Sequence, residues 1–178
     1  MSQDSSPAAQ PAANQKSQED QMQRTVLIAS DHGGFALKAA LVQALRQAEC
    51  LVEDLGPDCT GSCDYPAFAD KLCKRLLDAG EDGQNGQMLG ILVCGTGLGM
   101  SMAANRHAGI RAAVCTCEFM SRMARAHNNA NVLCLGERVV GQGLGLDIAR
   151  AFLATNFEGA RHLRRISQFD TYQTPAKS

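Results

Sequence analysis

The sequence predicts a doubly wound α/β fold, in which helices cover both faces of a five-stranded parallel sheet. Short apolar runs alternate strictly with segments of helical hydrophobic spacing, the connecting loops are short, and glycine-rich turns follow the first and third apolar runs. The chain has 178 residues, of which 45% are hydrophobic, which is enough for one domain with a conventional core.

The expected strands are short apolar runs, and the expected helices carry apolar residues every three or four positions. The strands are expected at residues 25–30, 50–54, 88–93, 110–115 and 131–135. The helices are expected at residues 35–48, 68–79, 98–106, 118–126, 144–154 and 161–168. A loop rich in Gly, Asn and Asp is expected at 80–87. These units suit a Rossmann-like sheet of order 2-1-3-4-5, followed by a C-terminal helical arm.

The domain is expected to cover residues 24–170. Residues 1–23 are rich in Ser, Gln, Ala and Pro and contain almost no large apolar side chain, so burial cannot offset the entropy of ordering them. Disorder is expected there, and a frayed end is expected at 171–178. The tail lacks the apolar core of a signal peptide, and its acidic residues argue against an organellar transit sequence, which favours a cytoplasmic protein.

Composition argues against several kinds of partner. The formal net charge is −1, so there is no basic excess for nucleic acid, and no apolar run approaches the ~20 residues that cross a bilayer. Without a secretory signal, the eight cysteines are expected to be free thiols. The close pairs, Cys59 with Cys63 and Cys115 with Cys117, have no second pair at zinc-finger spacing.

The most informative segment is residues 94–99 (CGTGLG), between the third expected strand and a helix. Successive backbone amides in such a turn form a concavity that binds an anion, and Cys94 stands at its mouth. A dinucleotide-binding turn needs G-x-G-x-x-G after the first strand, whereas this turn is G-x-G-x-G after the third. A cysteine phosphatase would have an arginine six positions after the thiol, where this chain has Met100.

Asp31 and His32 follow the first expected strand and precede two glycines. Strands one and three are neighbours in the expected order, and the winding direction reverses between them, so this turn and the Cys94 loop should meet. Asp31 is either a helix cap or a group that holds a substrate hydroxyl. His32 could donate a hydrogen bond to a phosphate, and Arg138, directly after the fifth strand, could reach the same phosphate.

Two further groups of residues are expected at the amino edge of the sheet: residues 127–131 (HNNAN), and the basic cluster of Arg161, His162 and Arg165. A helix that precedes a parallel strand ends at the amino edge, so a catalytic His127 would most simply serve a neighbouring subunit's site. The alternative is a helix stop signal, because Asn and His suit helix C-termini. The basic cluster is either a solvated face or an arm that completes a partner's phosphate pocket. Two further basic residues are expected to be structural: His107 and Arg111.

Taken together, these segments resemble the sugar-phosphate isomerase family that contains ribose-5-phosphate isomerase B and the galactose-6-phosphate and allose-6-phosphate isomerases. The resemblance covers residues 26 to about 169, and the segments are highly specific in combination. They are residues 30–35 (SDHGGF), 64–66 (DYP), 94–101 (CGTGLGMS), 104–105 (AN), 109–112 (GIRA), 124–133 (ARAHNNANVL), 136–138 (GER) and 161–165 (RHLRR). The amino-terminal tail is outside the family pattern.

The resemblance implies interconversion of D-ribose 5-phosphate and D-ribulose 5-phosphate, without a metal or another cofactor. It also implies a homodimer or tetramer with sites at the subunit interface. In the family branch that this chain resembles, the loop cysteine, here Cys94, is the base; another branch uses a glutamate at the position of Met100. The resemblance further implies that His127 assists opening of the furanose ring. The remaining implied contacts are Asp31 and Asn128 with the sugar, and His32, Arg138, Arg161 and Arg165 with the phosphate.

The chemistry fits these residues independently. Aldose–ketose isomerisation moves a proton between C1 and C2 through a cis-enediolate, and one thiolate can take the proton and return it. The amides of Gly95, Gly97 and Gly99 and the hydroxyl of Thr96 can stabilise the enediolate oxygens, at ~3 kcal/mol for one such donor. A six-carbon sugar phosphate is the alternative substrate, and a non-catalytic sugar-phosphate-binding subunit is the alternative function.

Overall fold

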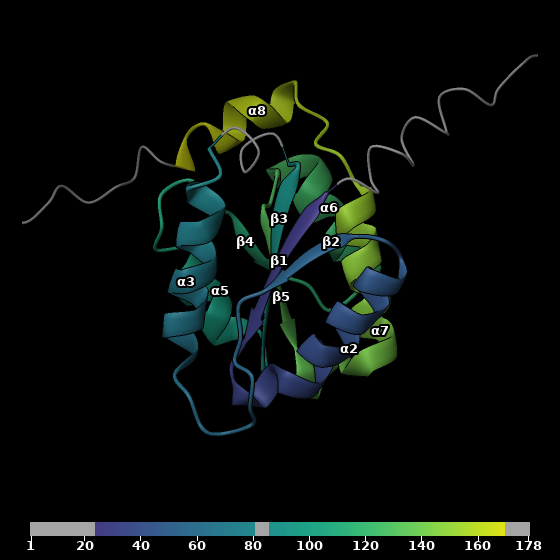
Figure 1. Ribbon diagram of the computed structural model, residues 1–178. Helices are drawn as coiled ribbons and strands as arrows, with labels where there is room; N and C mark the ends of the chain where they lie inside the picture. The colour runs from purple at the N-terminus through teal and green to yellow at the C-terminus, as the bar shows by residue number, and fades with distance from the viewer. Residues whose placement is uncertain (1–23, 81–85, 170–178) are drawn as a thin grey trace, which may run out of the picture.

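The computed structural model describes residues 24–80 and 86–169, so the expected disordered tail, the frayed end and most of the 80–87 loop lie outside the described residues. A parallel sheet of five strands lies between two layers of helices (Figure 1). Within the described residues, no helix combines the length and the apolar character that crossing a membrane requires.

Every expected element occurs close to its expected place. The strands are β1 (Thr25–Ser30), β2 (Leu51–Asp54), β3 (Met88–Cys94), β4 (Ala112–Val114) and β5 (Val132–Gly136). The helices are η1 (His32–Gly34), α2 (Phe35–Gln47), α3 (Tyr65–Leu77), α5 (Leu98–Ala104), α6 (Glu118–Asn128), α7 (Glu137–Ala154) and α8 (Arg161–Ile166). The largest difference is at α7, which begins at Glu137 instead of residue 144. Gly141 has φ 64° and interrupts it, so a short first turn precedes the main helix.

The predicted fold class is confirmed, but the predicted order 2-1-3-4-5 is wrong in its last two strands. The observed order is β2-β1-β3-β5-β4. Strand β5 reads VLCLG and is buried throughout, whereas β4 reads AAV and is only partly buried. A central strand is covered on both faces, so the longer and more apolar strand occupies the inner position and β4 forms the edge.

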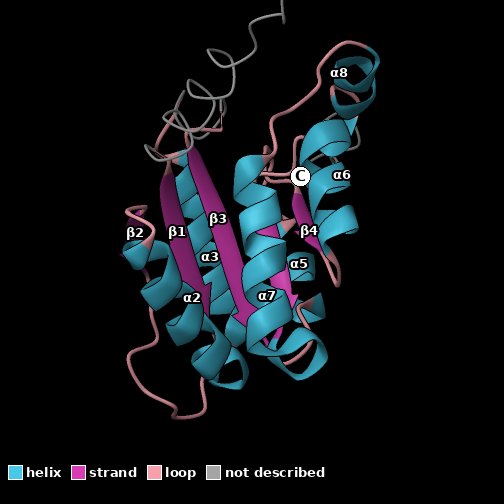
Figure 2. Cartoon of the chain, turned by 90° about the vertical axis from the view of Figure 1, so that its right-hand side faces the viewer, coloured by secondary structure: helices cyan, strands magenta, loops and turns pink. Residues whose placement is uncertain are grey.

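Helices α2, α6 and α7 cover one face of the sheet, and α3 and α5 cover the other (Figure 2). Right-handed crossovers explain this division. The chain steps from β4 back towards β3 to form β5, so α6 lies on the face opposite α5. In the predicted order that step would have gone forward, and α6 would have joined α3 and α5.

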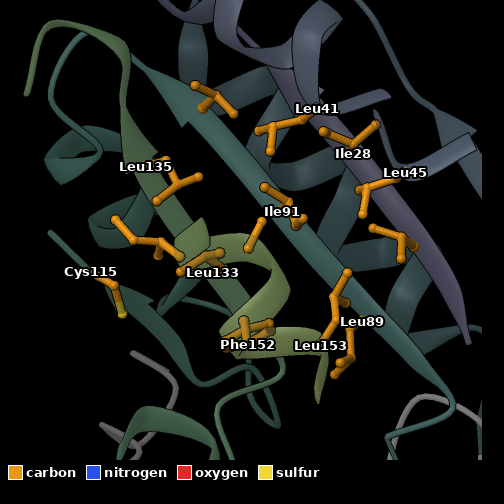
Figure 3. Close-up of a cluster of buried hydrophobic side chains, with 14 of the residues drawn as sticks. Ile28, Leu41, Leu45, Leu89, Ile91, Cys115, Leu133, Leu135, Phe152 and Leu153 are labelled. Atoms are coloured by element: carbon orange, nitrogen blue, oxygen red, sulfur yellow. The ribbon is translucent and has the colours of Figure 1, made fainter. Parts of the chain in front are cut away.

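Alternate residues of the central strands pack into two separate cores. Ile91 and Leu133 lie in the cluster on the α2–α7 face, with Leu41 and Phe152 (Figure 3). Cys94 belongs to the cluster on the α3–α5 face. The thiol of Cys94 is therefore placed by the strand pleat on one defined side of the sheet.

The carboxyl ends of β1 and β3 lie at the end of the molecule away from α8 (Figure 2). At this end the β1 turn lies against the last residues of β3. A Cβ atom on Gly34 would be 2.6 Å from the carbonyl carbon and oxygen of Val93 and 2.8 Å from the nitrogen of Cys94. Only glycine allows this approach without a shift of one backbone.

Replacement of Gly34 by alanine is expected to lower the free energy of unfolding by about 1–3 kcal/mol, because the added methyl group must push the turn after β1 away from the end of β3. Gly143→Ala is the matched control, since a Cβ there meets nothing within 4 Å and α7 gains a better helix former. Urea unfolding at equal protein concentration measures both variants. Equal midpoints for Gly34→Ala and wild type would contradict the close backbone contact.

Candidate active site

The β1 turn places an acid and an imidazole at the carboxyl edge of the sheet. Asp31 is 8% exposed, and its Oδ1 accepts a hydrogen bond from the Gly33 amide at 2.9 Å. Asp31 is therefore the cap of η1, as one of the two interpretations held. His32 is exposed, and its Nδ1 accepts a hydrogen bond from the Cys63 amide at 3.3 Å. In the neutral ring this leaves the proton on Nε2, which can donate to an anion.

The glycine loop holds the Cys94 thiol at the end of β3. The Gly97 amide donates to Cys94 Sγ at 3.0 Å, and Gly97 adopts a left-handed conformation with φ 80°. Cys94 is 5% exposed. The Thr96 hydroxyl is at the surface and accepts a hydrogen bond from the Leu98 amide at 3.4 Å. The loop therefore directs one backbone donor at the sulfur before any ligand is bound.

The two turns meet, as the order of β1 and β3 predicted. The Asp31 amide donates to the Val93 carbonyl at 3.2 Å. A Cβ on Gly33 would lie 3.3 Å from the nitrogen of Gly95. Asp31, His32 and Cys94 are thus brought to one edge of the sheet from two segments far apart in the sequence.

Arg138 comes to the same place from β5. Its amide donates to the Gly95 carbonyl at 3.1 Å. Its guanidinium carbon would be 3.4 Å from a Cβ built on Gly95, so this exposed cation lies over the loop. The structure thus places Arg138 at the carboxyl edge of the sheet, beside the glycine loop.

Tyr65 is a neighbour of the loop that was missing from the predicted site. Two of its ring carbons would be 2.9 Å from a Cβ on Gly99, and the ring is partly exposed. Tyr65 belongs to the quoted segment 64–66, but its distance from residue 99 in the sequence concealed the contact.

The other predicted site residues lie at the opposite edge of the sheet from Cys94. His127 and Asn128 end α6, and Arg161 and Arg165 lie on α8. Figure 2 shows α8 and the adjoining end of α6 at the amino edge, away from the arrowheads of β1 and β3. A single chain therefore does not bring these residues to Cys94, as the topology argument had predicted.

The imidazoles of His127 and His162 stack, with ring centroids 4.3 Å apart and an angle of 6° between the planes. Glu158 lies beside both, with Oε2 3.8 Å from Nε2 of His127 and 3.6 Å from Nε2 of His162. The pKa of His162 is lowered, first by desolvation and then by the neighbouring His127 and Arg161. Glu158 was also missing from the predicted site, because it lies outside the quoted motifs.

Two asparagines of residues 127–131 have structural roles. Asn129 ends α6 in a left-handed conformation, with φ 45°. The Asn131 side chain accepts from the Arg111 amide at 2.8 Å and donates to the Gly109 carbonyl at 2.8 Å. The helix-stop interpretation is therefore right for part of this segment.

The two basic residues expected to be structural make contacts of that kind. Nε2 of His107 lies 3.5 Å from a carboxylate oxygen of Asp70. The Arg111 side chain donates to the carbonyls of Asn129 and Gly109. All eight cysteines are free thiols, as expected.

Lowering the pH is expected to destabilise the protein through His162. Because the pKa of His162 is lower in the folded chain, the unfolded chain binds the proton more readily, and stability falls as the pH drops through about 6.5. His162→Gln should therefore lose less unfolding free energy than wild type between about pH 7.5 and pH 5.5. Urea titrations at both pH values measure this, and parallel losses would contradict it.

Known proteins share the sequence pattern and the fold of this chain. Residues 26–169 match the family model described as Ribose/Galactose Isomerase. Ribose-5-phosphate isomerase B of Escherichia coli is 39% identical over 143 residues, which are 80% of this chain and 92% of that protein. The crystal structure of the Thermotoga maritima ribose 5-phosphate isomerase is 46% identical, with a TM-score of 0.78 over 83% of this chain and 98% of that chain.

A ribose-5-phosphate isomerase B from Mycoplasma genitalium, whose structure contains bound ribulose-5-phosphate, is 41% identical. It has a TM-score of 0.78 over 85% of this chain and 97% of that chain. The family match covers nearly all of the described residues, and the relatives align over almost their full lengths. This chain belongs to the ribose/galactose isomerase family.

Proposed function

We propose that this protein is an aldose–ketose isomerase that interconverts D-ribose 5-phosphate and D-ribulose 5-phosphate, with Cys94 as the base. The proposal depends mainly on the environment of the Cys94 thiol. Its sulfur accepts a hydrogen bond from the Gly97 amide at 3.0 Å, and it lies at the same edge of the sheet as Asp31, His32 and Arg138. The names of the relatives and the ribulose-5-phosphate in the Mycoplasma genitalium structure support this choice of substrate.

In the aldose-to-ketose direction, the Cys94 thiolate takes the proton from C2 of the open-chain sugar. The C–H electron pair forms the C1–C2 double bond of a cis-enediolate, and the former carbonyl oxygen becomes negative. The same thiol then returns the proton to C1, and the C2 hydroxyl passes its proton to O1, so that O2 becomes the ketone oxygen and O1 a hydroxyl. The loop amides and the Thr96 hydroxyl are the donors placed to stabilise the enediolate oxygens. A methionine side chain has no group that exchanges a proton, so Met100, at the position that carries a glutamate in the other family branch, cannot be the base here.

The remaining groups at this edge suit the rest of the substrate. The Asp31 carboxylate accepts from Gly33 through one oxygen and can accept a sugar hydroxyl as well. The His32 Nε2 proton and the Arg138 guanidinium suit the phosphate. Phosphate binding away from the reacting carbons supplies energy that orients C1 and C2 against the thiol.

A second copy of the chain completes the site in this proposal. In this proposal His127 opens the furanose ring. Within one subunit, however, His127 and Cys94 lie at opposite edges of the sheet. Leu98 and Met102, one turn apart on α5 beside the glycine loop, are 53% and 64% exposed. Exposed apolar side chains at this location suit burial against a partner. We therefore propose a homodimer in which each site takes Cys94 from one subunit and His127 from the other.

Cys94→Ala is expected to lower kcat by about 10²–10⁴-fold, because it removes the group that moves the proton. Binding of ribose 5-phosphate, measured by calorimetry, should persist. Cys117→Ser is the matched control: Cys117 is exposed and occupies the N-cap position of α6, where serine is a favoured residue. Near-wild-type turnover of Cys94→Ala would eliminate the thiol as the base. Tight binding without turnover in the wild-type protein would instead support a non-catalytic sugar-phosphate-binding subunit.

Mixing Cys94→Ala and His127→Ala subunits is expected to restore activity. In a twofold-symmetric dimer, the mixed dimer has one site with both substitutions and one site with neither, so random mixing gives about a quarter of wild-type activity. Differently tagged subunits allow the mixed dimer to be purified and assayed alone. An inactive mixed dimer would show that the two residues do not serve one shared site.

A further inference from the structure

We propose that His127, Glu158 and His162 form a binding site for a divalent transition metal ion, best matched by Zn²⁺, and that occupation of this site inhibits the enzyme. The metal-site part stands on the side-chain cluster alone. The inhibition part rests on the proposed isomerase function, in which His127 takes part.

The three donors are already close together. The Glu158 carboxylate oxygen is 3.8 Å from Nε2 of His127 and 3.6 Å from Nε2 of His162, and all three donor atoms lie within 4.8 Å of one another. Zinc bonds to nitrogen and oxygen are about 2.0–2.2 Å long, so neighbouring donors of a tetrahedral ion are about 3.3–3.5 Å apart. Movements of a few tenths of an ångström by the carboxylate therefore suffice on the Glu158 side.

The backbone holds the cluster together before any ion arrives. The Glu158 amide donates to the Ala126 carbonyl at 3.0 Å, which ties Glu158 to the residue before His127. The His162 amide donates to the Gly159 carbonyl at 3.0 Å, and this turn brings His162 back towards Glu158. Three donors from two separate segments are thus assembled by hydrogen bonds that do not involve the donor atoms themselves.

The imidazole of His162 has its free electron pair on the required atom. Nε2 of His162 accepts a hydrogen bond from Nε of Arg161 at 3.3 Å, so in the neutral ring the proton is on Nδ1. An incoming ion replaces Arg161 at this nitrogen, and the exposed arginine side chain turns outward. The stacked rings must also tilt apart, because each lone pair lies in its own ring plane. His127, with a side chain 37% exposed, has the room to tilt.

The donor set favours a particular class of ion. Two imidazole nitrogens and one carboxylate suit Zn²⁺ and its neighbours in the first transition row, whereas Mg²⁺ and Ca²⁺ prefer oxygen donors throughout. Three protein ligands leave a fourth position for water. Coordination would occupy the lone pair of His127, which then could no longer exchange a proton with the sugar ring, and turnover would fall.

Glu158→Gln separates metal binding from the proposed catalytic role of His127, because it removes a metal ligand and leaves both histidines in place. Glu118→Gln is the matched control, an exposed glutamate at the other end of α6. Zn²⁺ affinity and stoichiometry are measured by competition with a chromophoric chelator on the full-length protein. The Co²⁺ complex is examined by absorption spectroscopy to identify the donors, and circular dichroism confirms the fold of each variant.

We expect one ion per wild-type chain, at least about tenfold weaker binding by Glu158→Gln, and unchanged binding by Glu118→Gln. Zinc should inhibit the wild type reversibly by chelator and should inhibit Glu158→Gln far less. Equal affinities of Glu158→Gln and wild type, or a sulfur-to-cobalt charge-transfer band that places the ion on cysteines, would overturn the site. Equal zinc inhibition of both would overturn its inhibitory role. If neither the wild type nor the variants turned over substrate even without zinc, the proposed function would be contradicted. The binding data would still decide the metal site.

Discussion

The end of β3 is held between two close backbone contacts, and the shape of the glycine loop depends on both. On one side Gly34 lies against Val93, and on the other a Cβ on Gly136 would be 2.6 Å from the carbonyl carbon of Thr96. Neither contact leaves room for a side chain, so the loop cannot shift towards β1 or β5. A loop fixed in this way keeps the Gly97 amide directed at the Cys94 thiol, which limits the reorganisation needed when charge develops nearby.

The residues after β5 connect this clamp to the rest of the fold. Gly136 packs on the loop, and the next residue, Glu137, accepts a hydrogen bond from the Leu37 amide at 2.8 Å in the first turn of α2. A carboxylate at a helix N-terminus also interacts favourably with the helix dipole. The following residue, Arg138, binds the Gly95 carbonyl through its amide and extends its guanidinium over the loop. Three consecutive residues therefore join the loop, a helix and a candidate phosphate ligand.

The alternation of strands and helices was enough to predict that the β1 turn meets the Cys94 loop, because β1 and β3 are neighbours whichever way the later strands are ordered. The alternation was not enough to order β4 and β5, because it does not show whether the chain moves outward or back towards β3 after β4. The sequences VLCLG and AAV differ in apolar character, and this difference predicts the order only when the two strands are compared for the inner position of the sheet. Tyr65 and Glu158 escaped prediction because their importance comes from contacts with Gly99 and His127 on other elements.

The same topology separates the proposed chemistry into two halves. In a parallel sheet each strand ends at the carboxyl edge, and each helix that precedes a strand ends at the amino edge. Cys94 at the end of β3 and His127 at the end of α6 therefore cannot meet within one chain. If the site is shared as we propose, ring opening and proton transfer become linked to association of two subunits, and activity depends on protein concentration through the dimer equilibrium. A monomer would keep a nearly buried thiol at one end and a stacked imidazole pair at the other, each without the partner that makes it catalytic. The fold itself thus makes subunit pairing a condition for turnover in this proposal.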